Sequence, residues 1–150
     1  MVDDSDYEMI NRWKWKAVHI RSGWYAKRNG WKDGKEFGMW MHRFIMGSPE
    51  GLDIDHKDHN TLNNQRHNLR IATTTQNMGN TRIGTRNKSG FKGVSWSKER
   101  KKWEAQVAAY GKKQFHERFS TAREAAIAYD FHAVRVFGEF ALTNASLGLL

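Results

Sequence analysis

Residues 53–60 read DIDHKDHN and place three aspartates, two histidines and an asparagine in eight positions. Such side chains suit phosphodiester hydrolysis, which needs a base for the attacking water and a cation that offsets charge on the phosphate. A histidine with its ordinary pKa of about 6.5 is largely neutral at cellular pH and can be that base. Carboxylate and amide oxygens can hold a hard divalent cation. Asp55 and His56, followed by Asn68 and Asn77, offer all of these groups.

The sequence around these residues predicts a strand, a polar loop, a second strand and a helix. The expected ranges are 51–55 for the first strand, 56–67 for the loop, 68–73 for the second strand and 73–82 for the segment that begins the helix. Adjacent strand residues point to opposite faces, so Asp55 and His56 share one site only if the strand breaks there. The alternative interpretation is a polar hairpin tip whose asparagines only cap turns.

Residues 10–47 contain short aromatic runs separated by Gly, Asn and Asp. In the run WKWKAVHI, Trp13, Trp15 and Ala17 fall on one face of a strand. This alternation predicts half-buried strands in a small antiparallel sheet, with the tryptophans in its core. The run MWMHRFIMG at 39–47 fits either a helix or a buried strand.

The length of 150 residues is that of one ordinary domain or of two small ones. The chain has no cysteine, which excludes a disulfide partner and a thiolate zinc site. No apolar run approaches the roughly 20 residues of a membrane span. The acidic N-terminus lacks the apolar core of a secretory signal. We therefore expect a protein that is not secreted and has no membrane partner.

The C-terminal half has a different pattern, and residues 81–90 predict an exposed basic linker before it. Three strand-length runs follow, and then a helix that Thr121 and Glu124 begin as a capping box and Gly138 ends. Its alanine stripe suits close packing on a sheet. Residues 88–118 carry nine Lys or Arg against three Asp or Glu, the pattern of a polyanion binder. Nucleic acid is favoured over a membrane, with a merely solvated basic surface as the alternative.

The order of Asp-His, NN, NLR and QN within residues 41–80 resembles an HNH nuclease of the homing-endonuclease type, built on a ββα-metal (His-Me finger) module. The resemblance implies that His56 is the general base. It also implies that Asp55 and Asn77 hold one divalent cation, and that Asn68 holds the loop and orients the histidine. Many family members have histidine where this chain has Asn77. An amide oxygen there suits Mg²⁺ or Mn²⁺ ahead of Zn²⁺.

Several neighbouring polar residues are assigned structural roles. Asp58 and His59 are expected to form turns, and Asn63 and Asn64 to stabilise the loop. His42 and Arg43 form an HR pair that recurs in such nucleases, for which packing or a phosphate contact is expected.

Residues 89–145 resemble the ethylene-response-factor (Apetala-type) DNA-binding domain through KGV, KWEAQV, F(S)TAREAAIAYD and GEFALTN. The resemblance implies a three-stranded sheet that lies in the DNA major groove, with the helix packed behind it. The expected DNA contacts, with those from the nuclease part and the linker, are Arg43, Arg82, Arg86, Lys88, Lys92, Ser95, Lys102, Gln106, Lys113 and Phe115. Core packing is an equal alternative for Phe115. Lysines mostly contact phosphate, so this part is expected to supply affinity more than base selectivity.

Together these observations predict an α+β protein. A β-rich nuclease domain would occupy residues 1–80, a basic linker 81–90, and a three-stranded antiparallel sheet packed on one helix 91–145. The expected function is metal-dependent hydrolysis of double-stranded DNA to 5′-phosphate and 3′-hydroxyl ends, by a monomer or homodimer in the cytoplasm of a bacterial or phage-infected cell. A non-catalytic DNA-binding regulator is the alternative.

Overall fold

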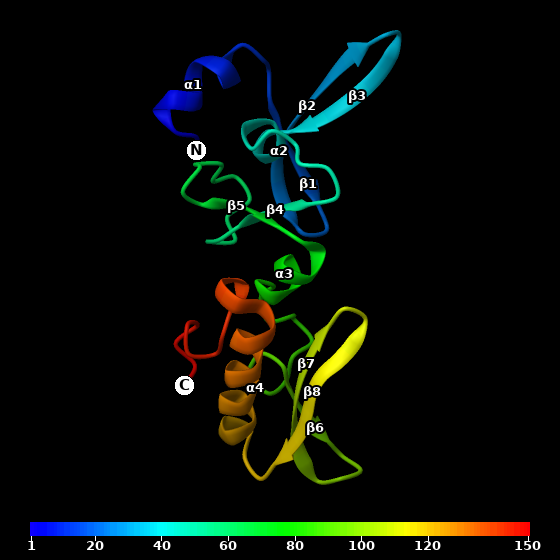
Figure 1. Cartoon of the computed structure of the whole chain (residues 1–150), viewed down its shortest axis with the longest axis vertical. Helices are drawn as coiled ribbons and strands as arrows, with labels where there is room; N and C mark the ends of the chain where they lie inside the picture. Colours follow the sequence, from blue (N-terminus) through cyan, green and yellow to red (C-terminus); the bar gives the residue numbers. More distant parts are fainter. The chain divides into compact units, whose positions relative to one another are not determined.

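The computed structural model describes residues 1–150, and the chain divides into two compact units, Met1–Thr73 and Thr74–Leu150. The predicted α+β class is confirmed, because three small antiparallel sheets are combined with four α-helices (Figure 1). The division falls ahead of the predicted linker, and residues 81–90 contain neither helix nor strand. None of the α-helices is long and apolar enough to cross a membrane.

The first unit begins with a helix and a three-stranded sheet in the order β1-β2-β3. Its elements are α1 (Asp4–Asn11), β1 (Lys16–Ile20), β2 (Gly23–Lys32), β3 (Lys35–Trp40) and α2 (Met41–Ile45). The hairpin between β2 and β3 turns at Asp33 and Gly34, which both have positive φ. A two-residue turn of this kind matches the twist of the paired strands, which explains the Asp-Gly sequence.

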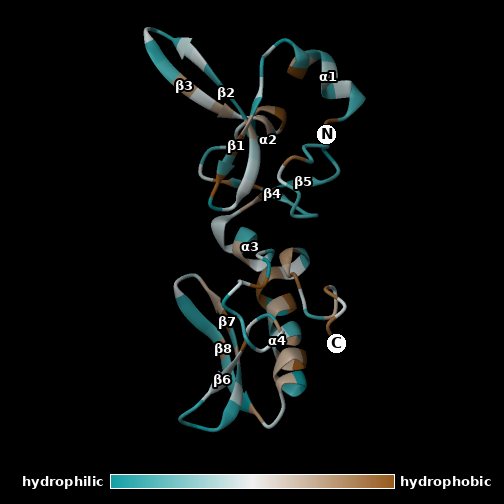
Figure 2. Ribbon diagram, turned by 180° about the vertical axis from the view of Figure 1, so that it is seen from behind, coloured by the Kyte–Doolittle hydropathy of each residue, from teal (hydrophilic) through white to brown (hydrophobic).

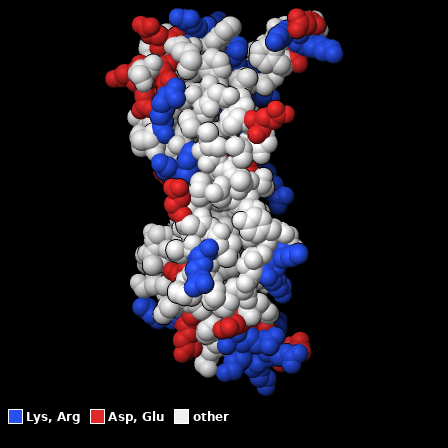
Figure 3. All heavy atoms as spheres, viewed as in Figure 1, with Lys and Arg blue, Asp and Glu red and all other residues white.

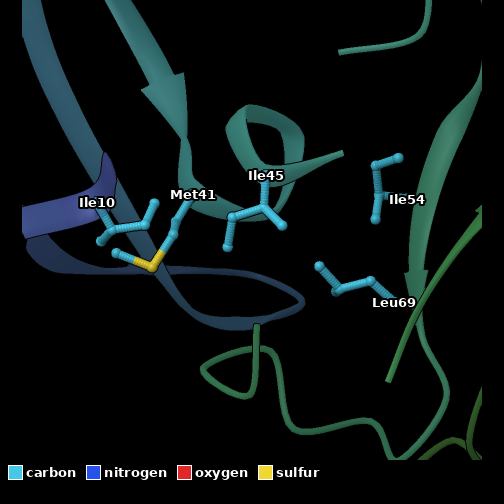
Figure 4. Packing of buried hydrophobic residues seen from close by; sticks show 5 residues of the cluster. All are labelled: Ile10, Met41, Ile45, Ile54 and Leu69. Carbon is cyan, nitrogen blue, oxygen red and sulfur yellow. The ribbon is translucent and has the colours of Figure 1, made fainter. Parts of the chain in front are cut away.

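The two strands on either side of the polar loop, β4 (Asp53–His56) and β5 (Leu69–Ala72), form a separate two-stranded sheet. The hydrophobic core of the unit lies between this sheet and the helices (Figure 4). Its buried side chains are Ile10 from α1, Met41 and Ile45 from α2, Ile54 from β4 and Leu69 from β5. The core therefore joins the helix after β3 directly to the strand that ends at His56.

The tryptophans of the N-terminal run differ from the prediction. Strand β1 begins only at Lys16, so Trp13 and Trp15 precede it. Trp15 is half-buried beside the core, whereas Trp13 is 47% exposed and its ring covers the guanidinium of Arg28 at 3.9 Å. The ring of Trp13 thus covers the buried cation of Arg28, which is only 9% exposed. The ambiguous run at 39–47 contains the end of β3 and then α2.

The second unit packs one long helix against a three-stranded sheet in the order β6-β7-β8. Its elements are α3 (Thr74–Gly79), β6 (Val94–Ser97), β7 (Lys102–Ala109), β8 (Lys112–Phe119), α4 (Ala122–Phe137) and the 3₁₀ turn η1 (Gly138–Phe140). The predicted capping box of Thr121 and Glu124 and the glycine stop at Gly138 are both present. Figure 2 shows apolar residues along α4 and a largely hydrophilic β8.

Small residues allow α4 to lie close to the sheet. Ala105, Ala125 and Ala126 are completely buried there. Gly93 has φ +70°, and a Cβ on it would lie 1.9 Å from the ring of Tyr129 on α4. Only glycine fits this position, because a side chain would be strained by the backbone and would collide with the ring. The other face of the sheet is left to polar side chains.

Candidate active site

His56 is the last residue of β4, and a buried amide holds its ring. His56 is only 5% exposed, and its Nε2 lies 3.2 Å from Oδ1 of Asn64. The Nδ2 of Asn64 donates to the carbonyl of Leu62, which directs Oδ1 toward the ring. Because Oδ1 can only accept, Nε2 carries the proton in this contact. A neutral His56 therefore has an unprotonated Nδ1, the nitrogen that can accept a proton from water.

Burial and neighbouring rings favour the neutral form of this imidazole. Burial is the largest influence and lowers the pKa of His56, while Asn64, Asp58 and Asp55 partly oppose it. His42 lies edge-on to His56 with ring centroids 5.2 Å apart. Burial, followed by the charges of His56 and Arg43, lowers the pKa of His42 to about 3. Both imidazoles are accordingly neutral at neutral pH, the state that a general base requires.

Asp55 is paired with a cross-strand arginine. Its residue is 5% exposed, and its register partner on β5 is Arg70. Nε and one terminal nitrogen of Arg70 both donate to Oδ2 of Asp55 at 2.8 Å. Strand pairing continues to His56, opposite Leu69, so the expected break falls after the histidine. Arg70 was not singled out from the sequence, although its position in NLR opposite Asp55 follows from the hairpin register.

Asn68 organises the loop that follows His56. Its Nδ2 donates to Asp58 Oδ1 at 2.9 Å and to the carbonyl of Asn63 at 2.8 Å, and its Oδ1 accepts from the Asp58 amide. Asp58 also accepts from the Asn60 amide and from Asn63 Nδ2. These bonds close the loop into one network. The side chain that bonds to the imidazole is Asn64, whereas the sequence suggested Asn68 for that task.

No pattern in the sequence separates Asn64 from its neighbour Asn63. Both asparagines of the NN pair are buried, Asn64 to 1% exposure, but Asn63 points to Asp58 and Asn64 to His56. Adjacent loop residues of one type differ only in the direction that the folded loop imposes on them. Once both amides are buried, each needs a hydrogen-bond partner, and the two partners differ.

Asn77 lies on α3, which belongs to the second unit. The end of this helix is held by buried contacts within that unit. The carbonyl of Gly79 accepts from Lys92 Nζ at 2.7 Å and from the Leu142 amide at 3.1 Å. A Cβ on Gly79 would lie 2.7 Å from the side chain of Phe137. The helix that carries Asn77 is thus anchored by the chain that follows it.

Two predicted DNA contacts lie inside the second unit. Lys92 is 8% exposed, and its pKa is lowered to about 8, chiefly by burial. Phe115 is 9% exposed and stacks on His132 with ring centroids 3.7 Å apart. Phe115 therefore packs in the core, which is the alternative given for it above. The ammonium of Lys92 donates a hydrogen bond to Gly79 at the end of α3. Neither side chain is presented to a ligand at the surface.

The other predicted contacts differ in accessibility. Arg43 is half-buried and donates to the carbonyls of Leu52 and Pro49 at 3.0 and 2.8 Å, so it braces the loop before β4. The exposed ones are Arg82, Arg86, Lys88, Ser95, Lys102, Gln106 and Lys113. The outward face of the sheet also carries an ionic cluster that the sequence did not indicate, in which Glu104 binds both Arg118 and His116. The bulge between Val107 and Ala108 shifts this register.

The possible metal donors of the predicted site are oxygen atoms. No group of three or more His, Cys, Asp or Glu side chains is arranged to hold a metal ion. Asp55 offers a carboxylate oxygen in the first unit, and Asn77 carries an amide oxygen on α3 of the second unit. Mg²⁺ commonly takes one or two protein ligands and keeps several waters, whereas structural zinc needs four protein ligands. Oxygen donors of this kind suit a hard cation such as Mg²⁺ better than zinc.

Comparison with known proteins finds a family match over the segment that contains the candidate site. Residues 40–79 match the family described as HNH endonuclease. An uncharacterized HNH endonuclease of Acanthamoeba polyphaga mimivirus is 34% identical over 138 residues, which cover 87% of this chain and 71% of the relative. Protein 3.8 of Escherichia phage T7 is 48% identical over 64 residues, which cover 43% of this chain and 53% of the relative. No solved structure matches the chain.

Proposed function

Because the chain belongs to the HNH endonuclease family, we propose that it is a metal-dependent nuclease that hydrolyses double-stranded DNA to 5′-phosphate and 3′-hydroxyl ends. His56 is the general base in this proposal, and Asp55 with Asn77 holds one Mg²⁺ or Mn²⁺ ion. The observation that carries the proposal is the buried His56, whose Nε2 is tied to Asn64 so that Nδ1 is the basic nitrogen. HNH nucleases generally use a divalent cation and act on DNA.

Each residue has a task that follows from its contacts. His56 takes the proton of the attacking water at Nδ1, and its lowered pKa keeps it unprotonated at neutral pH. Arg70 fixes the carboxylate of Asp55 through Oδ2. Asn68 and Asp58 hold the loop that carries Asn64. A bound cation would offset the charge of the phosphate and stabilise the leaving 3′ oxygen.

The second unit is proposed to bind DNA through the sheet face opposite α4, in the manner of ethylene-response-factor domains. Its exposed polar residues and the exposed linker support this. They are Ser95, Lys102, Gln106 and Lys113 on the strands and Arg82, Arg86 and Lys88 before them. Figure 3 shows Lys and Arg gathered over the connection between β6 and β7. Because lysine mostly contacts phosphate, the sheet is expected to contribute affinity.

The proposal is tested with supercoiled plasmid in Mg²⁺ or Mn²⁺. Wild-type protein should nick or linearise the plasmid, while the His56→Ala and Asn77→Ala variants should bind it without cutting. Binding without cleavage by all three proteins would identify a DNA-binding regulator instead. Cleavage by His56→Ala at the wild-type rate would refute the assignment of the base. Ligation of the cleaved ends without prior phosphatase or kinase treatment checks the expected end chemistry.

A further inference from the structure

One face of the N-terminal sheet carries two lysines directly opposite each other. The register pairs Lys16 on β1 with Lys27 on β2. Like charges directly opposite on a sheet are unfavourable. None of the ion pairs in the structure includes either residue. The Lys27 ammonium lies over the ring of Trp40, 5.2 Å from its centroid. The two cations thus stand side by side without an acidic partner.

The same face continues to the candidate base. Residues that alternate along a strand share a face, so Tyr25 lies on the face of Lys27, as does its register partner Val18. The Tyr25 ring is edge-on to His56, with centroids 6.1 Å apart, and 5.6 Å from His42. Two residues along a strand span about 7 Å. The pair of lysines is therefore two residues, or about 7 Å, beyond the tyrosine whose ring packs against His56.

We infer that this surface, formed by Lys16, Tyr25, Lys27 and Trp40 and called here the Lys27 face, binds backbone phosphates of duplex DNA next to the phosphate that is cleaved. The inference rests on the proposed nuclease function. Phosphates recur about every 3.4 Å of helix axis on each strand. The lysines thus lie within a few nucleotides of the position that His56 would attack.

The charge of the surrounding chain supports this partner. Residues 12–40 contain eight Lys or Arg against two Asp or Glu. Asp33 lies in the β2–β3 turn, and Glu36 accepts a hydrogen bond from Asn29 at 2.8 Å. Both acidic residues belong to the part of the hairpin near its turn. The half of the sheet nearest His56 is therefore cationic, which is complementary to a polyanion.

The side chain of Lys27 occupies space that is open only because residue 38 is a glycine. A Cβ on Gly38 would lie 2.6 Å from Lys27 Cε and 3.0 Å from Nζ. The lysine side chain therefore crosses β3 over Gly38 on its way to Trp40. Gly38→Ala would displace the ammonium while leaving the net charge unchanged, because the contact is with the end of a flexible side chain. This substitution therefore tests whether the position of the Lys27 charge matters, because the charge itself is kept.

The test measures duplex DNA binding to the full chain in EDTA, so that binding is followed without cleavage. The double variant Lys16→Gln, Lys27→Gln is compared with Lys32→Gln, Lys35→Gln. The second pair is also matched across strands but lies on the opposite face of the same sheet. Each phosphate contact contributes about −0.9 to the slope of log affinity against log salt. Between 50 and 200 mM salt, the affinity of wild type should therefore fall about tenfold more than that of the Lys16/Lys27 variant.

The control variant should keep the wild-type salt slope, and Gly38→Ala should weaken binding at low salt. An unchanged slope in the Lys16/Lys27 variant, or an equal change in the control, would overturn the assignment of this face. Thermal melts of each variant confirm that it is folded. Failure of wild-type protein to cut plasmid with any divalent cation would refute the proposed nuclease function instead, and the slopes would still report on this surface.

Discussion

Removal of the Asn64 amide should impair catalysis more than its distance from the phosphate chemistry suggests. Asn64 is 1% exposed, and its Oδ1 lies 3.2 Å from Nε2 of His56. In Asn64→Leu the ring N–H would remain buried without this acceptor, which costs about 1–3 kcal/mol. The imidazole can recover that loss by rotating or by moving its proton to Nδ1, and either change disables the base. Since 1.4 kcal/mol is about tenfold in rate, kcat should fall between about 5-fold and 150-fold.

The matched variant is Asn64→Asp, which keeps an oxygen acceptor for Nε2. A carboxylate there stabilises the protonated ring, so it raises the pKa of His56. This variant should cut at close to the wild-type rate at high pH and lose activity at a higher pH than wild type does. The assay is single-turnover plasmid cleavage with saturating Mg²⁺ between pH 5.5 and 9, a range set about the ordinary histidine pKa.

The proton position is read independently from ¹⁵N-labelled histidine. The spectrum of wild type should show the Nε2–H form of His56, and that of Asn64→Leu a mixture of the two neutral forms. Asn63→Ala is the control, because the neighbouring amide bonds to Asp58 and does not touch the imidazole. Wild-type cleavage by Asn64→Leu, or equal loss in both Asn64 variants at high pH, would refute the reasoning.

Three further predictions concern stability and binding. The pKa of His42 is about 3 in the folded protein and about 6.5 in the unfolded chain, so the unfolded state binds more protons as the pH falls below 6.5. The free energy of unfolding should therefore drop by about 1.4 kcal/mol per pH unit toward pH 3. Urea titrations of the His42→Asn variant should show a shallower dependence of this free energy on pH. Arg70→Met should destabilise the metal-free protein by about 3 kcal/mol or more, because it removes the cation paired with buried Asp55, and added Mg²⁺ should restore part of the loss in thermal melts. Lys92→Met should cost about 1–3 kcal/mol in denaturant unfolding but leave the salt slope of DNA binding unchanged, since its ammonium donates to Gly79; a smaller slope would place Lys92 on DNA after all.

Local sequence determined those features that depend on neighbouring residues. The capping box at Thr121 and Glu124 and the stop at Gly138 use groups within one helical turn, so the letters and their spacing suffice. The polar loop between β4 and β5 was likewise predicted, because a strand, a turn-rich segment and a second strand follow one another directly. The order of Asp-His, NN, NLR and QN is also a local feature, and it indicates the HNH endonuclease family from sequence alone.

Tertiary structure decided the direction of each side chain. Nothing in the letters distinguishes Asn63 from Asn64, yet the folded loop turns one toward Asp58 and the other toward His56. The resemblance to ethylene-response-factor domains places Lys92 among the DNA contacts, whereas in the folded unit its ammonium donates to the buried carbonyl of Gly79.

The Lys27 face shows the same distinction. The basic and aromatic residues of the N-terminal run are visible in the sequence, but periodicity alone assigned its tryptophans to a core. The strand register places Lys16 opposite Lys27, and the packing of two separate sheets sets Tyr25 against His56. The order of the motif residues thus indicated the family to which the chain belongs. The pairing of strands decided which groups meet, because a register brings together residues that no local pattern connects.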